Sequence, residues 1–91
     1  PIAERSLARQ LVLRGEPYRI NEGRGGGDAD KAIFWFTLAS RVDPSYDRPE
    51  VEIGAVLMNR FRYVEAEQHF RLALARDDSA GAAKRRTPSN R

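Results

Sequence analysis

Apolar residues recur at intervals of three and four in four stretches of this sequence, and this spacing predicts amphipathic α-helices. The clearest stretch lies between Asp28 and Pro44, where Ala32, Phe36 and Ala39 fall on one stripe. Two small residues beside one aromatic residue suit close packing against a second helix. The four predicted helices cover residues 3–14, 29–42, 49–60 and 63–76.

Residues that favour helix ends support these boundaries. Asp28 or Asp30 can accept hydrogen bonds from the first-turn amides of the second predicted helix, and their charge suits its positive end. Gly15 is a suitable end for the first helix, while Asp47 and Pro49 are suitable for the beginning of the third.

The helical period disappears in two places. Residues 15–27 contain five glycines and a proline, which predicts a long connection, flexible at its glycine-rich end. Connections between helices commonly have about two to eight residues, so its length is unusual. After residue 76, Asp and Ser residues are expected to end the fourth helix, with room for a short capping helix. Residues 81–91 are expected to form a basic, disordered tail.

The stripe of the second predicted helix returns 34 positions later as Ala66, Phe70 and Ala73. An internal period of this length predicts stacked helical hairpins. The expected fold is all-α, with a first hairpin over residues 1–46 and a second over residues 47–80.

Residues 47–80 resemble a tetratricopeptide repeat along their whole length. The usual closing proline is replaced by Asp78. The resemblance implies a right-handed α–α superhelix of two antiparallel hairpins, whose work is protein recognition or assembly and which carries no catalytic site. The matching positions are Ile53, Gly54, Leu57, Tyr63, Ala66, Phe70, Ala73 and Leu74.

The first copy resembles the same repeat less closely. About a dozen extra residues separate its two helices, and this glycine-bearing loop is similar to that of the related Sel1-like repeats. Their second helix often carries the alanine, tryptophan and aromatic pattern found here as Ala32, Trp35 and Phe36. The remaining matches to the tetratricopeptide pattern are Leu7, Ala8, Leu11, Ala39 and Pro44.

Two adjacent aromatic residues, Phe34 and Trp35, are a candidate contact site. The second copy has polar residues at these positions, including His69, which is expected on the solvent side of its helix. Large aromatics at such positions indicate a contact. Either Tyr18 and Ile20 of the inserted connection cover Trp35, or a partner protein does.

The first helix of each hairpin lines a groove in tetratricopeptide repeats, so the resemblance implies a partner-binding groove here. Arg5 and Arg9 lie one turn apart and could hold a carboxylate or phosphate, although two solvated arginines would have the same spacing. The candidate partner-binding residues of this groove are Arg5, Arg9, Val12, Val51, Ala55, Met58 and Asn59.

Composition argues against catalysis and against a resident cofactor or metal. The chain has no cysteine and one histidine, and no nucleophile lies near a base. The glycine run 23–27 follows no predicted strand and lacks the lysine that closes a phosphate-binding loop. The sequence therefore predicts a protein that is not an enzyme.

Charge and hydropathy limit the kind of partner. The net charge of +3 is concentrated near the end of the sequence in Lys84, Arg85, Arg86 and Arg91. This tail, together with Arg5 and Arg9, is the basis for an alternative role at nucleic acid or another anionic surface. No stretch approaches the roughly 20 apolar residues of a membrane span, and there is no signal-peptide block, so a soluble chain of undetermined compartment is expected. About three repeats are normally needed for stability, and the preferred partner is therefore another protein, a larger complex or a second copy.

Overall fold

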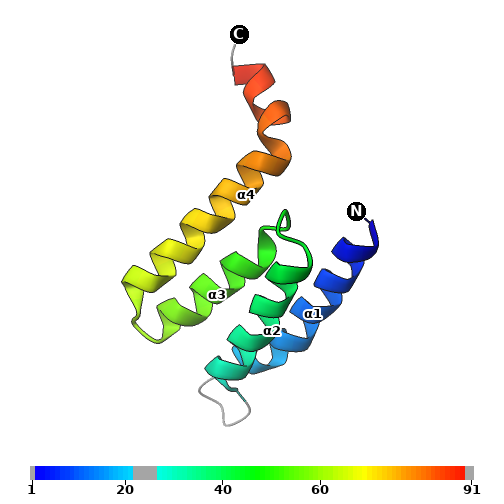
Figure 1. Cartoon of the computed structure of the whole chain (residues 1–91). Helices are drawn as coiled ribbons and strands as arrows, with labels where there is room; N and C mark the ends of the chain where they lie inside the picture. The colour runs from blue at the N-terminus through cyan, green and yellow to red at the C-terminus, as the bar shows by residue number, and fades with distance from the viewer. Residues whose placement is uncertain (1, 22–26, 90–91) are drawn as a thin grey trace.

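The structure, a computed structural model, describes residues 2–21 and 27–89, with side chains as far as Arg76. These residues form four helices and no strand, which confirms the all-α class. The helices are α1 (Ile2–Ile20), α2 (Ala29–Val42), α3 (Arg48–Asn59) and α4 (Tyr63–Ser89) (Figure 1).

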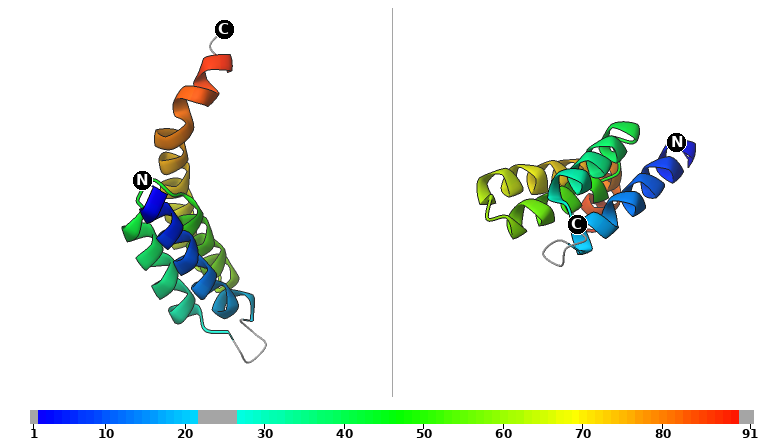
Figure 2. Two further views of the ribbon diagram at one scale, coloured as in Figure 1. Left: turned by 90° about the vertical axis from the view of Figure 1, so that its right-hand side faces the viewer. Right: turned by 90° about the horizontal axis from the view of Figure 1, so that it is seen from below.

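The helices alternate in direction and pack in chain order (Figures 1 and 2). α1 packs along α2, and α3 packs along α4, so the chain makes two antiparallel hairpins. α3 also lies against α2 and touches α1, and it therefore joins the hairpins. The C-terminal half of α4 extends beyond the other helices.

The core is built from the stripe that the sequence predicted. Ala32, Phe36 and Ala39 of α2 are fully buried, and Ala66 of α4 is nearly so. Small residues let the helix backbones approach, while the Phe36 ring fills the space between them. Around these residues lie the buried apolar side chains Ala8, Leu11, Val12, Ala29, Ile53, Val56 and Leu57.

The predicted end of the first helix at Gly15 is wrong, because α1 continues to Ile20 and includes Pro17. Gly15 is buried, and a Cβ atom at this position would lie only 2.7 Å from Cε1 of Phe36. The glycine therefore permits close helix packing and does not end the helix. The connection to α2 is correspondingly shorter, and residues 22–26 of its predicted glycine-rich part lie outside the described residues.

The beginnings of α2 and α3 differ in how they are capped. Asp28 caps α2 as predicted, since its side chain accepts a hydrogen bond from the Lys31 amide at 3.1 Å. Asp47 precedes α3, but its side chain makes no capping hydrogen bond, and Pro49 is the second residue of that helix. The start of α3 thus depends on proline and tertiary packing more than on a side-chain cap.

α4 also differs from its expected length. The sequence predicts an end near Arg76 followed by a short capping helix and a disordered tail from residue 81, whereas the backbone is helical without a break from Tyr63 to Ser89. No proline or glycine lies between residues 77 and 80, so the local sequence does not oblige the helix to stop there.

The corner between α3 and α4 contains the one described non-glycine residue with positive φ, Phe61 at 63°. The amides of Phe61 and Arg62 donate to the carbonyls of Met58 and Leu57 at 3.0 and 2.9 Å. This is the Schellman arrangement that ends a helix, and its left-handed position normally holds glycine. The Phe61 side chain is 77% exposed and stacks edge-on against Tyr63.

Replacing Phe61 with glycine is expected to raise the free energy of unfolding by about 1 kcal/mol, because the left-handed conformation strains a residue that has a Cβ atom. Urea unfolding followed by circular dichroism measures the change. Arg60→Gly is the matched control, since Arg60 has φ of −98° and glycine there should destabilise slightly. Equal effects of the two substitutions would contradict the strain argument.

Candidate functional site

The two hairpins share one internal contact. Gly15 lies under the ring of Phe36 in the first hairpin, and Gly54 lies under the ring of Phe70 in the second. Gly54 follows Gly15 by 39 positions, and Phe70 follows Phe36 by 34. These offsets match each residue of the first hairpin with its counterpart in the second, with Gly15 corresponding to Gly54.

In the first hairpin, the face presented by α1 to the next hairpin is covered by α3. Val12 of α1 is only 5% exposed. Nε of Arg19 lies 2.8 Å from Oε1 of Glu52 on α3, and Nη2 of Arg19 lies 2.7 Å from Oε1 of Glu16. Arg48 also pairs with Glu52, so this ion-pair network fastens α3 onto α1.

α2 contributes to the same covered face through a polar cluster around Glu50, a residue of α3 that is buried. Ser40 of α2 donates a hydrogen bond to Oε2 of Glu50 at 2.8 Å, and Arg76 of α4 lies 3.0 Å from that oxygen. Nδ1 of His69 lies 2.6 Å from Oε1. The expectation that His69 faces solvent is therefore wrong, because α4 turns it toward this carboxylate.

The matching face of the second hairpin is open. Val51, the counterpart of Val12, is 40% exposed, and Met58, the counterpart of Arg19, is 46% exposed. On α4, Leu74 corresponds to Ser40 and is 64% exposed. We call this surface the open face. It consists of Val51, Ala55, Met58, Phe70 and Leu74, together with Ala73, which is only 4% exposed.

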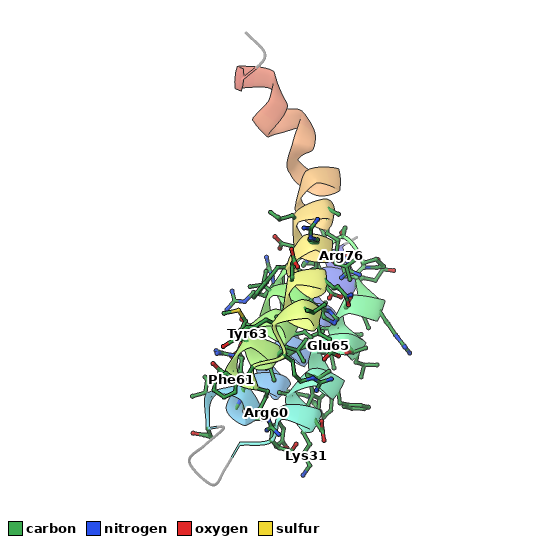
Figure 3. The ribbon with its side chains drawn as sticks, turned by 90° about the vertical axis from the view of Figure 1, so that its left-hand side faces the viewer. Lys31, Arg60, Phe61, Tyr63, Glu65 and Arg76 are labelled. Carbon is green, nitrogen blue, oxygen red and sulfur yellow. The ribbon has the colours of Figure 1, made fainter. Side chains whose placement is uncertain are left out.

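A groove of about 300 Å³ runs along the open face. Phe70 and Ala73 line it from α4, Val51 lines it from α3, and Asp47 stands at one end. The groove is therefore mainly apolar, with one carboxylate at its edge. Figure 3 faces α4 and shows Tyr63 and Phe61 on the opposite side of this helix from Glu65 and Arg76. Arg76 points toward Ser40 of the first hairpin. The side of α4 that carries Tyr63 therefore does not contain the Arg76 side chain.

The structure separates the groove residues predicted from the sequence. Val51, Ala55 and Met58 lie together on the open face, whereas Val12 occupies the matching position in the first hairpin and is buried. Asn59 is exposed next to Met58. Val12 therefore stabilises the stack and cannot contact a partner without unpacking α3.

Arg5 and Arg9 lie on α1, beside a separate hollow of about 600 Å³. Nε of Arg5 lies 2.6 Å from Oδ2 of Asp43, and its guanidinium stacks over the ring of Tyr46 at 4.5 Å. Arg9 is exposed. Because Asp43 neutralises Arg5 and lines the same hollow, the attraction of this site for an anion is weak.

Trp35 is half-buried by α1. The Arg14 guanidinium lies 5.5 Å from the centre of its ring, and Gly15 packs against its Cβ atom. Phe34 is exposed and meets Trp35 edge-on, with ring centres 5.3 Å apart. Ile20, one of the two residues expected to cover Trp35, is itself exposed. Phe34 is thus the more accessible of the two aromatic residues.

Three residues of the open face were not recognised as site residues from the sequence: Phe70, Ala73 and Leu74. From the sequence, they were assigned only to the repeat pattern. That pattern has the same residue types whether or not a further helix packs over them. The signal for a site was present in Leu74, because an apolar residue replaces Ser40 at the matching position.

The pKa of the Asp43 carboxyl is lowered from its usual value by a hydrogen bond from the Ser45 hydroxyl and by Arg5. Its ionised form therefore stabilises the fold above the pKa of the unfolded chain, and this contribution disappears as the pH falls through the lowered pKa. Asp43→Asn is expected to reduce the free energy of unfolding by about 1–2 kcal/mol at pH 7 and by much less near pH 2. Urea unfolding at both pH values measures this, and an equal loss at both would contradict it.

No family model, no curated protein and no solved structure matches this chain. Within the described part of the chain, no helix is both long and apolar enough to cross a membrane. The described residues also contain no group of three or more side chains suited to hold a metal ion. The geometry of the open face is therefore the basis for a functional assignment.

Proposed function

We propose that this chain is a non-catalytic interaction module that receives an amphipathic helix of a protein partner on its open face. One observation carries the proposal. On the first hairpin, α3 covers the positions of Val12, Arg19 and Ser40. The matching positions of the second hairpin hold the exposed apolar residues Val51, Met58 and Leu74. Exposed apolar patches of this kind mark protein interaction sites.

The fold assignment is part of this proposal. The repeated contact between glycine and phenylalanine supports membership of both hairpins in the tetratricopeptide repeat family, with Sel1-like features in the first. A right-handed α–α superhelix then provides the frame, and each added helix buries the face of the preceding hairpin. The partner helix would take the position that α3 takes on the first hairpin.

The chemistry of the open face specifies the partner helix. On the first hairpin, α3 brings Glu52 to Arg19 and Glu50 to Ser40. The open face has Met58 and Leu74 at those two places, so a helix that carried acidic residues there would bury unpaired charge. The partner must instead present apolar side chains, with a basic residue favoured near Asp47.

Photo-cross-linking in an extract of the source organism tests the proposal. A benzoylphenylalanine residue at position 74 is expected to label one apolar helical segment, which sequencing of the cross-linked peptide identifies. Position 72 is the matched control, because it also holds leucine in α4 but points about 200° away around the helix. Equal labelling from both positions, or a recovered segment without an apolar helical stripe, would contradict the proposal.

A further inference from the structure

The helix that fits the open face is present in the chain itself. α1 and α3 are counterparts, since Gly15 and Gly54 make the same contact within their hairpins. With the same offset of 39 positions, Leu13 of α1 corresponds to Glu52 of α3. Leu13 is 67% exposed, and it lies on the side of α1 away from α2.

The two ends of the stack differ from the internal interface in a matched way. Inside the chain, Glu52 of α3 meets Arg19 of α1. At the outer ends, Leu13 stands in place of Glu52 and Met58 stands in place of Arg19. Both charged residues of the internal contact are thus replaced by apolar residues at the ends. The two end residues therefore match each other as an apolar pair, as the internal residues match as an ion pair.

In a second pair, one charged and one polar residue are replaced by apolar residues. Glu50 and Ser40 meet inside the chain, and their counterparts at the two ends are Leu11 and Leu74. Leu11 is already buried in its own hairpin, whereas Leu74 is not. Both members of the pair formed by Leu13 and Met58 are therefore exposed, whereas only Leu74 is exposed in the second pair.

We propose that the open face binds α1 of a second copy of this chain, so that copies stack head to tail as α3 stacks on the first hairpin. This rests on the proposed function and names its partner. The contact joins two different surfaces, and each added copy presents a new open face. Such a heterologous contact leaves one unused surface at each end of a pair, so further copies can add as the concentration rises.

Two variants of the purified chain test this proposal by sedimentation. Wild type is expected to increase in mass with concentration from the 10.3 kDa monomer without stopping at a dimer. Leu13→Glu blocks α1, and Leu74→Glu blocks the open face, so each variant alone should associate at least about tenfold more weakly. An equimolar mixture should form a single dimer, because one variant retains α1 and the other retains the open face.

Leu7→Glu and Leu72→Glu are the matched controls, since both leucines are exposed and lie on the other sides of α1 and α4. They should associate like wild type, and circular dichroism verifies that every variant is folded. A wild-type chain that stays monomeric overturns the proposal. So does association that Leu74→Glu abolishes and Leu13→Glu leaves unchanged, because that pattern indicates two open faces in symmetric contact.

The cross-linking experiment separates the two proposals. A cross-link from position 74 to α1 of the same protein supports both. A cross-link to an apolar helix of a different protein supports the proposed function and overturns the stacking of copies.

Discussion

Replacing Arg76 with methionine is expected to lower the free energy of unfolding by about 3 kcal/mol, the largest loss among the substitutions considered. Arg76 lies 3.0 Å from Oε2 of Glu50, whose side chain is only 6% exposed. Removing one partner of a buried ion pair leaves a charge with neither water nor a countercharge, which costs about 3–5 kcal/mol. The lower end applies because Arg76 itself is partly exposed and His69 remains beside the carboxylate.

A double variant shows whether desolvation is the cause. Methionine at positions 50 and 76 removes both charges and keeps most of the side-chain volume, so it should recover much of the loss. Urea unfolding of wild type, Arg76→Met and the double variant measures both effects. If the double variant is as unstable as the single one, the cluster stabilises the fold through its hydrogen bonds to Ser40 and not by balancing buried charge.

Gly15→Ala is expected to lower the free energy of unfolding by about 2 kcal/mol. The new Cβ atom would lie 2.7 Å from Cε1 of Phe36 and 3.0 Å from Cβ of Trp35. Phe36 is fully buried and cannot move away, so α1 and α2 must separate. Overpacking of this kind costs about 1–3 kcal/mol and exceeds the helix propensity that alanine gains.

Gly54→Ala is the matched comparison for Gly15→Ala. The Cβ atom would come closer still to Phe70, but Phe70 lines the open groove and has room to rotate into it. A loss below about 1 kcal/mol is expected for Gly54→Ala in urea unfolding. Equal losses from the two substitutions would show that Phe70 is held as firmly as Phe36. Since the rotated ring would occupy the groove, this substitution should also weaken association of the purified chain.

The Glu50 cluster also connects stability with the candidate site. Glu50 joins α2 and α4 through Ser40 and Arg76, and it therefore holds the second hairpin at a fixed position on the first. On α4, Arg76 and Leu74 are two positions apart, so they point about 200° away from each other around the helix. The cluster thus fixes which side of α4 remains exposed.

The sequence alone determined the parts of this protein that depend on neighbouring residues. The spacing of Ala32, Phe36 and Ala39 predicted α2 and its buried stripe, because a helix places residues three and four apart on one side. Asp28 marked the start of α2 because its side chain bonds an amide three residues on. The 34-residue period also predicted two hairpins, because it repeats the spacing of apolar residues within single helices, which is a local property of the sequence.

Only the tertiary structure decided the features that depend on distant residues. Gly15 was predicted to end a helix and instead lies inside one. Its small size is needed for packing, because the Phe36 ring occupies the space that a side chain would fill. His69 and Arg5 were expected to face solvent or a partner, and they pair with Glu50 and Asp43, which lie 19 and 38 positions away in the sequence. The open face follows the same principle. Val12 and Val51 are the same residue type in matching positions, and the presence of α3 over Val12 makes one a core residue and leaves the other exposed.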